Sequence, residues 1–149
     1  MTQSIRKSQI DDIPELSELF DAYRVFYKKR TNLEAAKVFL TERMQKMDSE
    51  IFVCENESKE LLGFVQLYPS FSSTRLQKLW VLNDLFVAPK FRGKGISKQL
   101  IEKAKSLVIA SEACAMVLET EKSNAVGNSL YPKTGFVLNT EANFYEWQP

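Results

Sequence analysis

The segment around two closely spaced glycines contains the residues best suited to chemistry. A strand-like run ends at Val87, and Gly93 and Gly95 follow just before an amphipathic helix that begins at Ile96. The unpaired N–H groups in the first turn of a helix, together with the helix dipole, bind anions, and glycine lets the backbone approach one closely. Residues 89–105 contain six Lys or Arg and one Glu, a net charge of +5 that leaves −4 for the rest of the chain. The segment therefore predicts a site for an anionic ligand.

Two common phosphate-binding patterns do not fit this loop. The Walker pattern fails because no Gly-Lys pair is followed by Ser or Thr at the required spacing. The dinucleotide-binding fingerprint fails because Lys98 occupies the place of its third glycine. On the loop alone, an ordinary glycine turn beside a solvated basic helix face stays open next to an anion site.

The composition excludes several classes of protein. The chain has 149 residues, a formal charge of +1 and no histidine, which excludes Ser-His and Cys-His nucleophiles and zinc sites that use histidine. Cys54 and Cys114 lie sixty positions apart and outside any CxxC pair, so we expect two free thiols and no metal. No segment has the apolar length of a leader or a membrane span, and we expect a cytoplasmic protein with no membrane partner.

The hydrophobic periodicity predicts one mixed α/β domain over residues 1–149. Helical spacing of apolar residues predicts helices over 12–30, 31–47, 96–108 and 124–134. Apolar runs predict strands over 4–7, 50–55, 61–68, 79–87, 115–120, 136–138 and 144–147, with a loop over 69–74. This order corresponds to a sheet covered by helices.

Local signals favour particular helix ends. Asp12 is predicted to cap the first helix while Glu15 returns to the cap, and residues 31–34 form a second capping box. The second helix is expected to direct its apolar residues inward as far as Met47. Pro132 is expected to end or kink the last helix.

Read with its flanks, the glycine loop resembles a family signature. Residues 83–97 read Asn-Asp-Leu-Phe-Val-x-Pro-x-x-Arg-Gly-x-Gly-Ile-Ser, which closely resembles the acetyl-CoA-binding motif of the GCN5-related N-acetyltransferases (GNAT). Residues 124–136 read Asn-x-x-Gly-x-x-Leu-Tyr-x-x-x-Gly-Phe and resemble the second signature of that family. The element order is similar to the family over residues 3–147. The resemblance implies a mostly antiparallel sheet that splays open between about four helices, with acetyl-CoA as the acetyl donor and no metal.

The resemblance also assigns residues to the cofactor. The pyrophosphate of acetyl-CoA would lie on the backbone amides of Arg92, Gly93, Lys94, Gly95, Ile96, Ser97 and Lys98. The pantetheine arm would run along the backbone of Leu85, Phe86 and Val87, at the edge that the splayed sheet leaves open. Asn124 would contact the cofactor near its reactive end, and Tyr131 would protonate the leaving thiolate. Ser97 replaces the usual Gly or Ala and is expected to leave binding intact.

The sequence leaves open which group removes the proton of the amine. Asn83 stands where several family members carry a glutamate implicated as the base, and an amide cannot take up a proton. Asp84 is the nearest substitute, but strand alternation directs it to the opposite face unless a bulge intervenes. Glu119, near the end of the next predicted strand, is another candidate, and water or the bulk solvent is a further route.

Five aromatic residues have two interpretations. The family places its acceptor pocket between the first helices and the hairpin loop, where Tyr23, Phe26, Tyr27, Tyr68 and Phe71 would lie. Aromatic residues at helical spacing are also typical of a core. Both interpretations stay open.

Taken together, the motifs predict an acetyl-CoA-dependent N-acetyltransferase. The amine of a small molecule or a peptide would attack the thioester directly, with Tyr131 as general acid. The alternative is a non-catalytic acyl-CoA-binding sensor of the same fold, which the amide at Asn83 keeps open. The near-neutral total charge and the lack of interleaved aromatic residues after Phe91 argue against a nucleic-acid partner. A homodimer that pairs residues 144–147 at a sheet edge stays open.

Overall fold

The computed structural model describes residues 2–149. Backbone contacts divide the chain into two compact units, one ending at Leu118 and the other running from Glu119 to Pro149. Within the described residues, the first unit contains a five-stranded sheet of order β1-β2-β3-β4-β5. Its strands are β1 (Gln3–Lys7), β2 (Glu50–Asn56), β3 (Leu61–Ser72), β4 (Gln77–Val87) and β5 (Met116–Val117).

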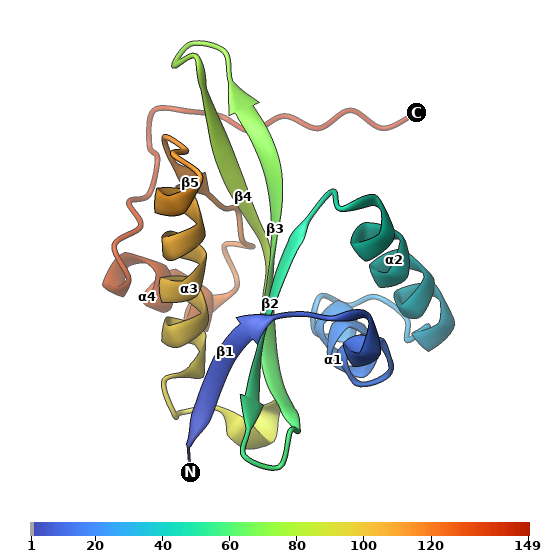
Figure 1. The fold of residues 1–149 in the computed structure, drawn as a ribbon. Helices are drawn as coiled ribbons and strands as arrows, with labels where there is room; N and C mark the ends of the chain where they lie inside the picture. Colours follow the sequence, from blue (N-terminus) through green and yellow to red (C-terminus); the bar gives the residue numbers. More distant parts are fainter. Residues whose placement is uncertain (1) are drawn as a thin grey trace. The chain divides into compact units, whose positions relative to one another are not determined.

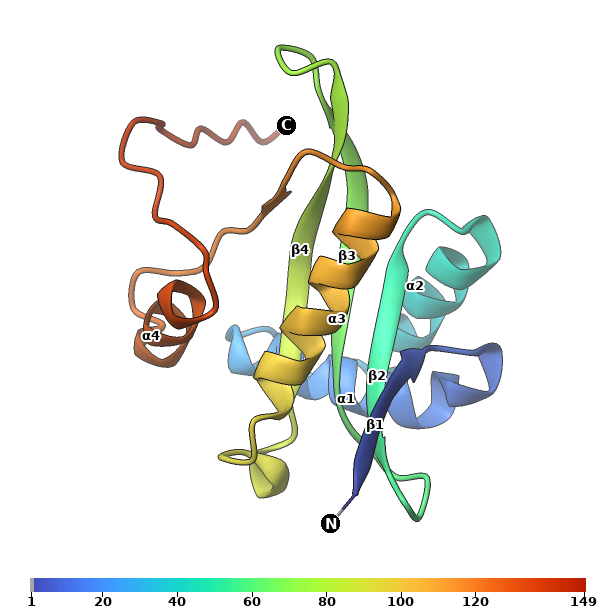
Figure 2. The same ribbon diagram turned by 60° about the vertical axis from the view of Figure 1, so that its left-hand side comes forward.

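Helices cover both faces of this sheet, as Figure 1 and Figure 2 show. α1 (Ile13–Phe26) and α2 (Leu33–Lys46) lie on one face, and α3 (Ile96–Ala110) lies on the other. The core on the first face consists of Leu16, Leu19, Phe20, Ala36, Leu40, Ile51, Val53, Leu61, Phe64 and Phe86. On the other face α3 buries Ile96, Leu100, Ile101 and Ala104, as expected for the apolar side of an amphipathic helix. The predicted mixed α/β class is confirmed.

The sheet opens along the outer edge of β4. The strands from β1 to β4 pair antiparallel, whereas β5 runs parallel to β4 and pairs only Trp80 with Met116 and Val81 with Val117. Among residues 2–149, this edge of β4 has no strand partner from Leu82 onward. The expected mostly antiparallel, splayed sheet is therefore confirmed, and its free edge leads directly into the glycine loop.

Several predicted strand limits were wrong. β3 continues through Ser72, because the segment expected to be a loop pairs with β4 in a long hairpin. β5 covers only two residues of the predicted 115–120. In the part of the chain that is described, residues 136–138 and 144–147 form no strand, and side chains such as Val137 and Tyr145 are exposed. A strand requires a backbone partner, which an apolar pattern alone does not supply.

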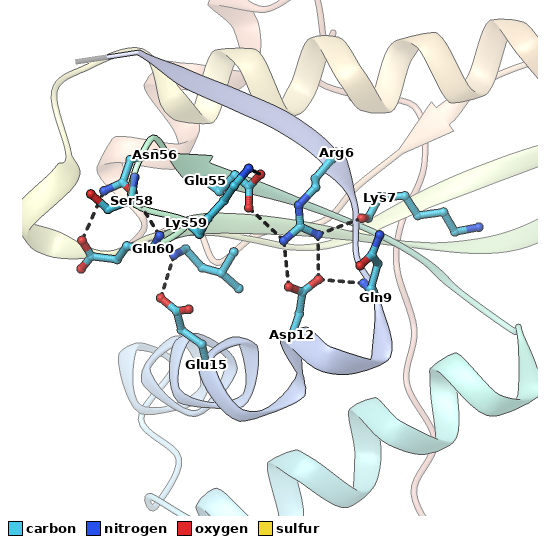
Figure 3. Close-up of polar contacts among 11 residues, drawn as sticks. Arg6, Lys7, Gln9, Asp12, Glu15, Glu55, Asn56, Ser58, Lys59 and Glu60 are labelled. Carbon is cyan, nitrogen blue, oxygen red and sulfur yellow. Dashed lines mark hydrogen bonds and ion pairs between the residues drawn. The ribbon is translucent and has the colours of Figure 1, made fainter.

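The predicted cap of α1 was also wrong, for a reason that Figure 3 shows. Asp12 precedes α1 but forms no side-chain cap to it. Its carboxylate accepts the Gln9 backbone N–H at 2.7 Å and two hydrogen bonds from Arg6 at 2.8 Å each. Glu15 accepts the backbone N–H of Leu61 at 2.7 Å instead of returning to the cap. A two-point bond with a guanidinium is stronger than a neutral cap, so Arg6 holds Asp12 away from the helix.

The start of α2 follows the prediction more closely than its end. Asn32 accepts the backbone N–H of Ala35 at 3.1 Å, while Thr31 donates to the carboxylate of Asp21 on α1. Met47 was expected to point inward, and this was wrong, since the side chain is exposed. The helix has ended before Met47, which adopts a left-handed φ of 50°.

The second unit contains α4 (Ala125–Lys133) within the described residues. Pro132 lies inside this helix, one residue before its end at Lys133. The expected helix end is confirmed. Among residues 2–149, no helix has the length and apolar character needed to cross a membrane.

Candidate active site

The glycine loop joins β4 to α3 through the short turn η2 (Pro89–Phe91). Gly93 and Gly95 have φ values of 79° and 77°, in the region that favours glycine. The backbone N–H of Gln99 donates to the carbonyl of Gly95 at 3.1 Å, which is the first bond inside α3. The N–H groups just before it, at residues 96–98, therefore have no carbonyl partner within the helix. The loop offers the donors that an anion needs.

Two of the loop's cations bind the protein itself. Arg92 donates from Nε to the carbonyl of Val87 at 2.9 Å, and its guanidinium lies 5.3 Å from the centre of the Phe86 ring. Lys90 forms a 2.6 Å ion pair with Glu60 of the β2–β3 hairpin. These contacts tie the loop to the end of β4 and to the hairpin. Part of the +5 charge therefore holds the loop in place.

The remaining loop cations lie closer to solvent. Lys94 is exposed, and its ammonium lies 5.6 Å from the centre of the Phe91 ring. Lys98 is exposed on the first turn of α3, and Ser97 beside it is half-buried. Lys94 and Lys98 are therefore the side chains best placed to attract an anion to the amides of this turn.

The free edge of β4 presents alternate backbone groups. The N–H of Ala88 donates to the carbonyl of Leu62 at 2.9 Å, so the backbone of this residue faces β3. Because successive residues of a strand direct their backbone groups to opposite sides, Leu85 and Val87 face the open edge and Phe86 faces β3. Val87 confirms the direction, since its carbonyl accepts the Arg92 side chain.

A β-bulge interrupts β4 at Asn83. The register pairs Asp84 with Gln66 and Leu82 with Leu67, which leaves Asn83 without a partner on β3. The amide of Asn83 donates to the Asp84 carboxylate at 3.1 Å. The sequence allowed Asp84 to share a side of the strand with Asn83 only if a bulge intervened, and the structure contains that bulge.

The bulge changes the face that Asp84 occupies. Trp80 points to α3, where its indole N–H donates to Ser111 at 2.8 Å. Regular alternation would place Asp84 on that same face. Instead, Asp84 lies with Phe86 on the α1 face, where Tyr23 of α1 is among its hydrogen-bonding neighbours. Tertiary pairing with β3, which no local signal reports, therefore determines the direction of this carboxylate.

Asp84 is buried and bound by neutral groups. Its residue is 3% exposed, and it accepts the Gln66 amide N–H at 2.5 Å in addition to that of Asn83. The Tyr23 hydroxyl donates to the backbone carbonyl of Asn83 at 3.1 Å. Burial raises the pKa of Asp84, and the hydrogen bonds from Gln66, Tyr23 and Asn83 oppose that rise. Among residues 2–149, no Lys or Arg forms an ion pair with this carboxylate.

The aromatic residues divide between the core and the surroundings of Asp84. Tyr23 packs edge-on against Phe64 and Phe86 of the sheet, at centroid distances of 6.0 and 6.2 Å. Tyr68 is half-buried, and burial together with the charge of Asp84 raises its pKa. Phe71 is exposed on the long hairpin. Tyr23 is therefore compatible with both interpretations, because its ring lies in the core while its hydroxyl reaches the bulge.

The second unit positions the other two predicted side chains. Asn124 caps α4: its carbonyl oxygen accepts the Gly127 N–H at 3.1 Å, and its amide donates to Thr120 at 3.0 Å. Tyr131 is half-buried and packs edge-on against Phe136, with centroids 5.7 Å apart. A β-carbon at Gly127 would lie 2.5 Å from the Asn124 amide nitrogen and 3.2 Å from the Tyr131 ring. Glycine at 127 therefore lets Asn124 and Tyr131 lie close together on α4.

Other sequence expectations are modified by the structure. Glu119 was a candidate base at the end of a strand, but β5 ends at Val117 and Glu119 is exposed. Gln66 and Ser49 were missed, although Gln66 stands out as a polar residue in the apolar run 61–67. Among the described residues, no group of three or more Cys, Asp or Glu is arranged to hold a metal ion.

Comparison with known proteins places the chain in one family. A family model described as an acetyltransferase (GNAT) domain matches residues 47–138. The uncharacterized N-acetyltransferase YhfO of Bacillus subtilis is 37% identical over 137 residues, covering 92% of this chain and 91% of the relative. A probable acetyltransferase of Haemophilus influenzae is 34% identical over 140 residues, covering 94% of each chain.

Solved structures agree with these relatives. The crystal structure of a probable acetyltransferase matches with a TM-score of 0.92 and 32% identity, covering 98% of this chain and 97% of the other. An aminoglycoside N-acetyltransferase solved in complex with CoA matches with a TM-score of 0.83 and 19% identity, covering 99% of this chain and 96% of the other, which shows a shared fold.

Proposed function

The chain belongs to the GNAT family of acetyltransferases, and from that premise we propose that it transfers the acetyl group of acetyl-CoA to a primary amine. The observation that carries the proposal is the continuity of three features in the first unit. The open edge of β4 leads into the glycine loop, and the loop leads into the exposed N-terminus of α3. The proposal treats residues 1–149 as one acetyltransferase domain that acts in the cytoplasm.

The residues of the first unit fit the donor. The backbone amides of residues 93–98 would hold the pyrophosphate, supported by the exposed ammonium groups of Lys94 and Lys98, whereas the N–H of Arg92 already donates to the carbonyl of Pro89 at 3.3 Å. The backbone groups of Leu85 and Val87 that face the open edge would bind the pantetheine amides in the manner of an added strand. Phe86 lies between them and directs its side chain into the core. Acetyl-CoA supplies the acetyl group as a thioester.

The transfer requires a base for the ammonium and an acid for the thiolate. An ammonium must lose a proton before its nitrogen can attack, and the departing thiolate must gain one. Asp84 is proposed to accept the first proton, because its buried carboxylate lacks a cation that would make it a weak base. Tyr131 is proposed to supply the second proton, and Asn124 to hold the cofactor beside it.

An assay of CoA release tests this function. Purified protein with acetyl-CoA and a panel of amines, including a polyamine, a lysine derivative, an aminoglycoside and a peptide N-terminus, is expected to release free thiol with at least one of them. Acetyl-CoA alone is expected to raise the melting temperature by mass action. Replacing Tyr131 by Phe should lower turnover while leaving acetyl-CoA binding unchanged. Failure of acetyl-CoA to bind would end the proposal.

The second candidate function is an acyl-CoA sensor that transfers nothing. The exposed amide of Asn83, which cannot act as a base, favours it. A sensor would bind acetyl-CoA tightly and release no thiol with any amine. Binding without turnover across the whole panel therefore separates the sensor from the enzyme.

A further inference from the structure

Gln66 connects the interior of the sheet to the bulge. Its side chain is 0% exposed, and a buried amide requires partners for both of its ends. The nitrogen donates to Asp84 at 2.5 Å, and the oxygen accepts the Ser49 hydroxyl at 3.0 Å. An ionised carboxylate only accepts hydrogen bonds, so the nitrogen end must face Asp84 and the oxygen end must face Ser49. The carboxylate of Asp84 thus fixes the orientation of the amide, and the Ser49 hydroxyl holds its oxygen end.

This contact exists only because of the bulge. The register places Gln66 directly opposite Asp84, one residue away from the point where Asn83 is looped out. Without the extra residue, Asp84 would lie on the α3 face and Gln66 would have no carboxylate to meet. The bulge and the buried amide therefore form one arrangement, which orients both oxygens of Asp84 through Gln66 and Asn83.

The groups around Asp84 orient it without making it a weak base. Tyr23 faces it from α1, and Tyr68 approaches it from β3. Arg43 of α2 and Asp48 before β2 act on the pKa of Tyr68, and they pair with each other at 2.8 Å. A cation bound directly to Asp84 would stabilise the carboxylate and weaken its affinity for a proton, whereas neutral amides fix its position with a smaller effect.

We propose that Gln66 is a positioning residue, held by Ser49, that keeps Asp84 oriented as the base for the acceptor amine. The inference rests on the proposed acetyltransferase function. In this step an N–H bond of the ammonium breaks, its electron pair stays on nitrogen, and the proton forms an O–H bond on Asp84. The nitrogen pair then forms the C–N bond as the C–S bond breaks. The thiolate takes a proton from Tyr131, the resulting phenolate regains one from the amide nitrogen as that nitrogen loses its second N–H proton, and Asp84 returns its proton to solvent.

Titration of Asp84 by carboxyl ¹³C NMR tests the positioning without any acceptor. Asp84→Asn identifies the signal, and the pKa is then measured in the wild type and in Gln66→Met, which keeps the length of the side chain and removes its donor. We expect the pKa of Asp84 to rise by about 1–2 units in Gln66→Met. Ser49→Ala, which disturbs the fold least, should raise it by a few tenths. An unchanged pKa in both variants would overturn the proposal.

A matched control removes another hydroxyl that bonds a buried side chain. Thr31→Val deletes the hydrogen bond to Asp21 on the same face of the sheet and is expected to leave the pKa of Asp84 unchanged. An equal shift in Thr31→Val would show that the effect of Gln66→Met is a general consequence of loosened packing.

The pH dependence of kcat/KM then tests the link to catalysis. The acidic limb should move upward in Gln66→Met by the shift seen in the NMR titration, while the KM for acetyl-CoA stays unchanged. An NMR shift with an unmoved acidic limb would overturn the role of Gln66 in the reaction. Wild-type inactivity toward every amine would end the proposed function, while the titration still decides whether Gln66 controls Asp84.

Discussion

Two buried carboxylates of the first unit differ in what surrounds their charge. Glu55 is 5% exposed and Asp84 is 3% exposed. Glu55 is bound by cations, with Arg6 at 3.0 Å and Lys59 at 3.2 Å (Figure 3). Asp84 is bound by the amides of Gln66 and Asn83. The pKa of Glu55 is lowered, chiefly by the hydrogen bond from Arg6, whereas burial raises the pKa of Asp84.

The difference separates structural carboxylates from reactive ones. Arg6 also makes a two-point bond to Asp12, so one guanidinium joins β1, β2 and the start of α1. A carboxylate bound in this way stays ionised and is a poor proton acceptor. Asp84 is as little exposed as Glu55, but it lies deeper in the protein and binds no cation, so its proton affinity is preserved. A low exposed fraction alone therefore does not identify the candidate base, and the depth of the carboxylate together with the charge of its binding partner does.

The largest expected effect is on turnover, and it comes from replacing the carboxylates of Asp84 and Glu55, one at a time, by amides. Asp84→Asn should lower kcat at pH 7 by about 100-fold or more, because an amide cannot accept the proton. Glu55→Gln should keep turnover within a few-fold while lowering the free energy of unfolding. Thiol release and urea unfolding measure the two quantities. Equal losses of turnover in both variants would remove the distinction between the two carboxylates.

Removal of the shared guanidinium should give the largest loss of stability. Arg6→Met leaves Asp12 and Glu55 buried without their main cation, and we expect the free energy of unfolding to fall by about 2–3 kcal/mol. The value is below that for a fully buried pair, since the Arg6 side chain is 30% exposed. Lys37→Met is the control, because the pair of Lys37 with Glu34 lies on the surface. A loss as small as that of the control would mean that solvent already screens the interactions of Arg6 with Asp12 and Glu55.

The sequence predicts those parts of the site that depend on local signals. The glycine loop and the start of α3 at Ile96 each follow from residues within a few positions of one another. The end of β4 at Val87 was likewise marked by the Ala-Pro pair that follows it. Backbone geometry at such places depends on glycine, proline and capping side chains, which a single sequence displays.

The parts that were missed depend on partners far away in the chain. The direction of Asp84 depends on a bulge that appears only when β4 pairs with β3. Asp12 has the pattern of a cap but binds Arg6, which then also reaches Glu55. Whether Asp12 caps the helix or binds Arg6 depends on how close the folded chain brings Arg6 to it. A short sequence motif does not contain that information.

The pH dependence of stability should have opposite signs in the two clusters. The pKa values of Asp12 and Glu55 are lowered, so their stabilisation is present above about pH 4.5 and is lost as the pH falls through their folded values. The pKa of Asp84 is raised above 3.8, so its contribution is most favourable below that value and is lost as the pH rises through the folded value.

Urea unfolding between pH 3 and pH 8 measures this contrast. Glu55→Gln should flatten the acid limb of the stability curve. Ionisation of Asp84 lowers the free energy of unfolding by at most about 1.4 kcal/mol per pH unit as the pH rises toward neutral. Asp84→Asn should remove this fall. Slopes that change in the same direction in both variants would contradict the assignment of opposite shifts.

The smallest expected effect comes from the more exposed of the two cations that bind Glu55. Lys59 lies 3.2 Å from Glu55 but is 78% exposed at its side chain. Lys59→Met should therefore lower the free energy of unfolding by less than about 0.5 kcal/mol, because solvent already screens this pair. Urea unfolding beside Arg6→Met provides the comparison. A loss equal to that of Arg6→Met would mean that exposed and half-buried cations lower the pKa of Glu55 to the same extent. The lack of a cation bonded directly to Asp84 would then no longer explain its proton affinity.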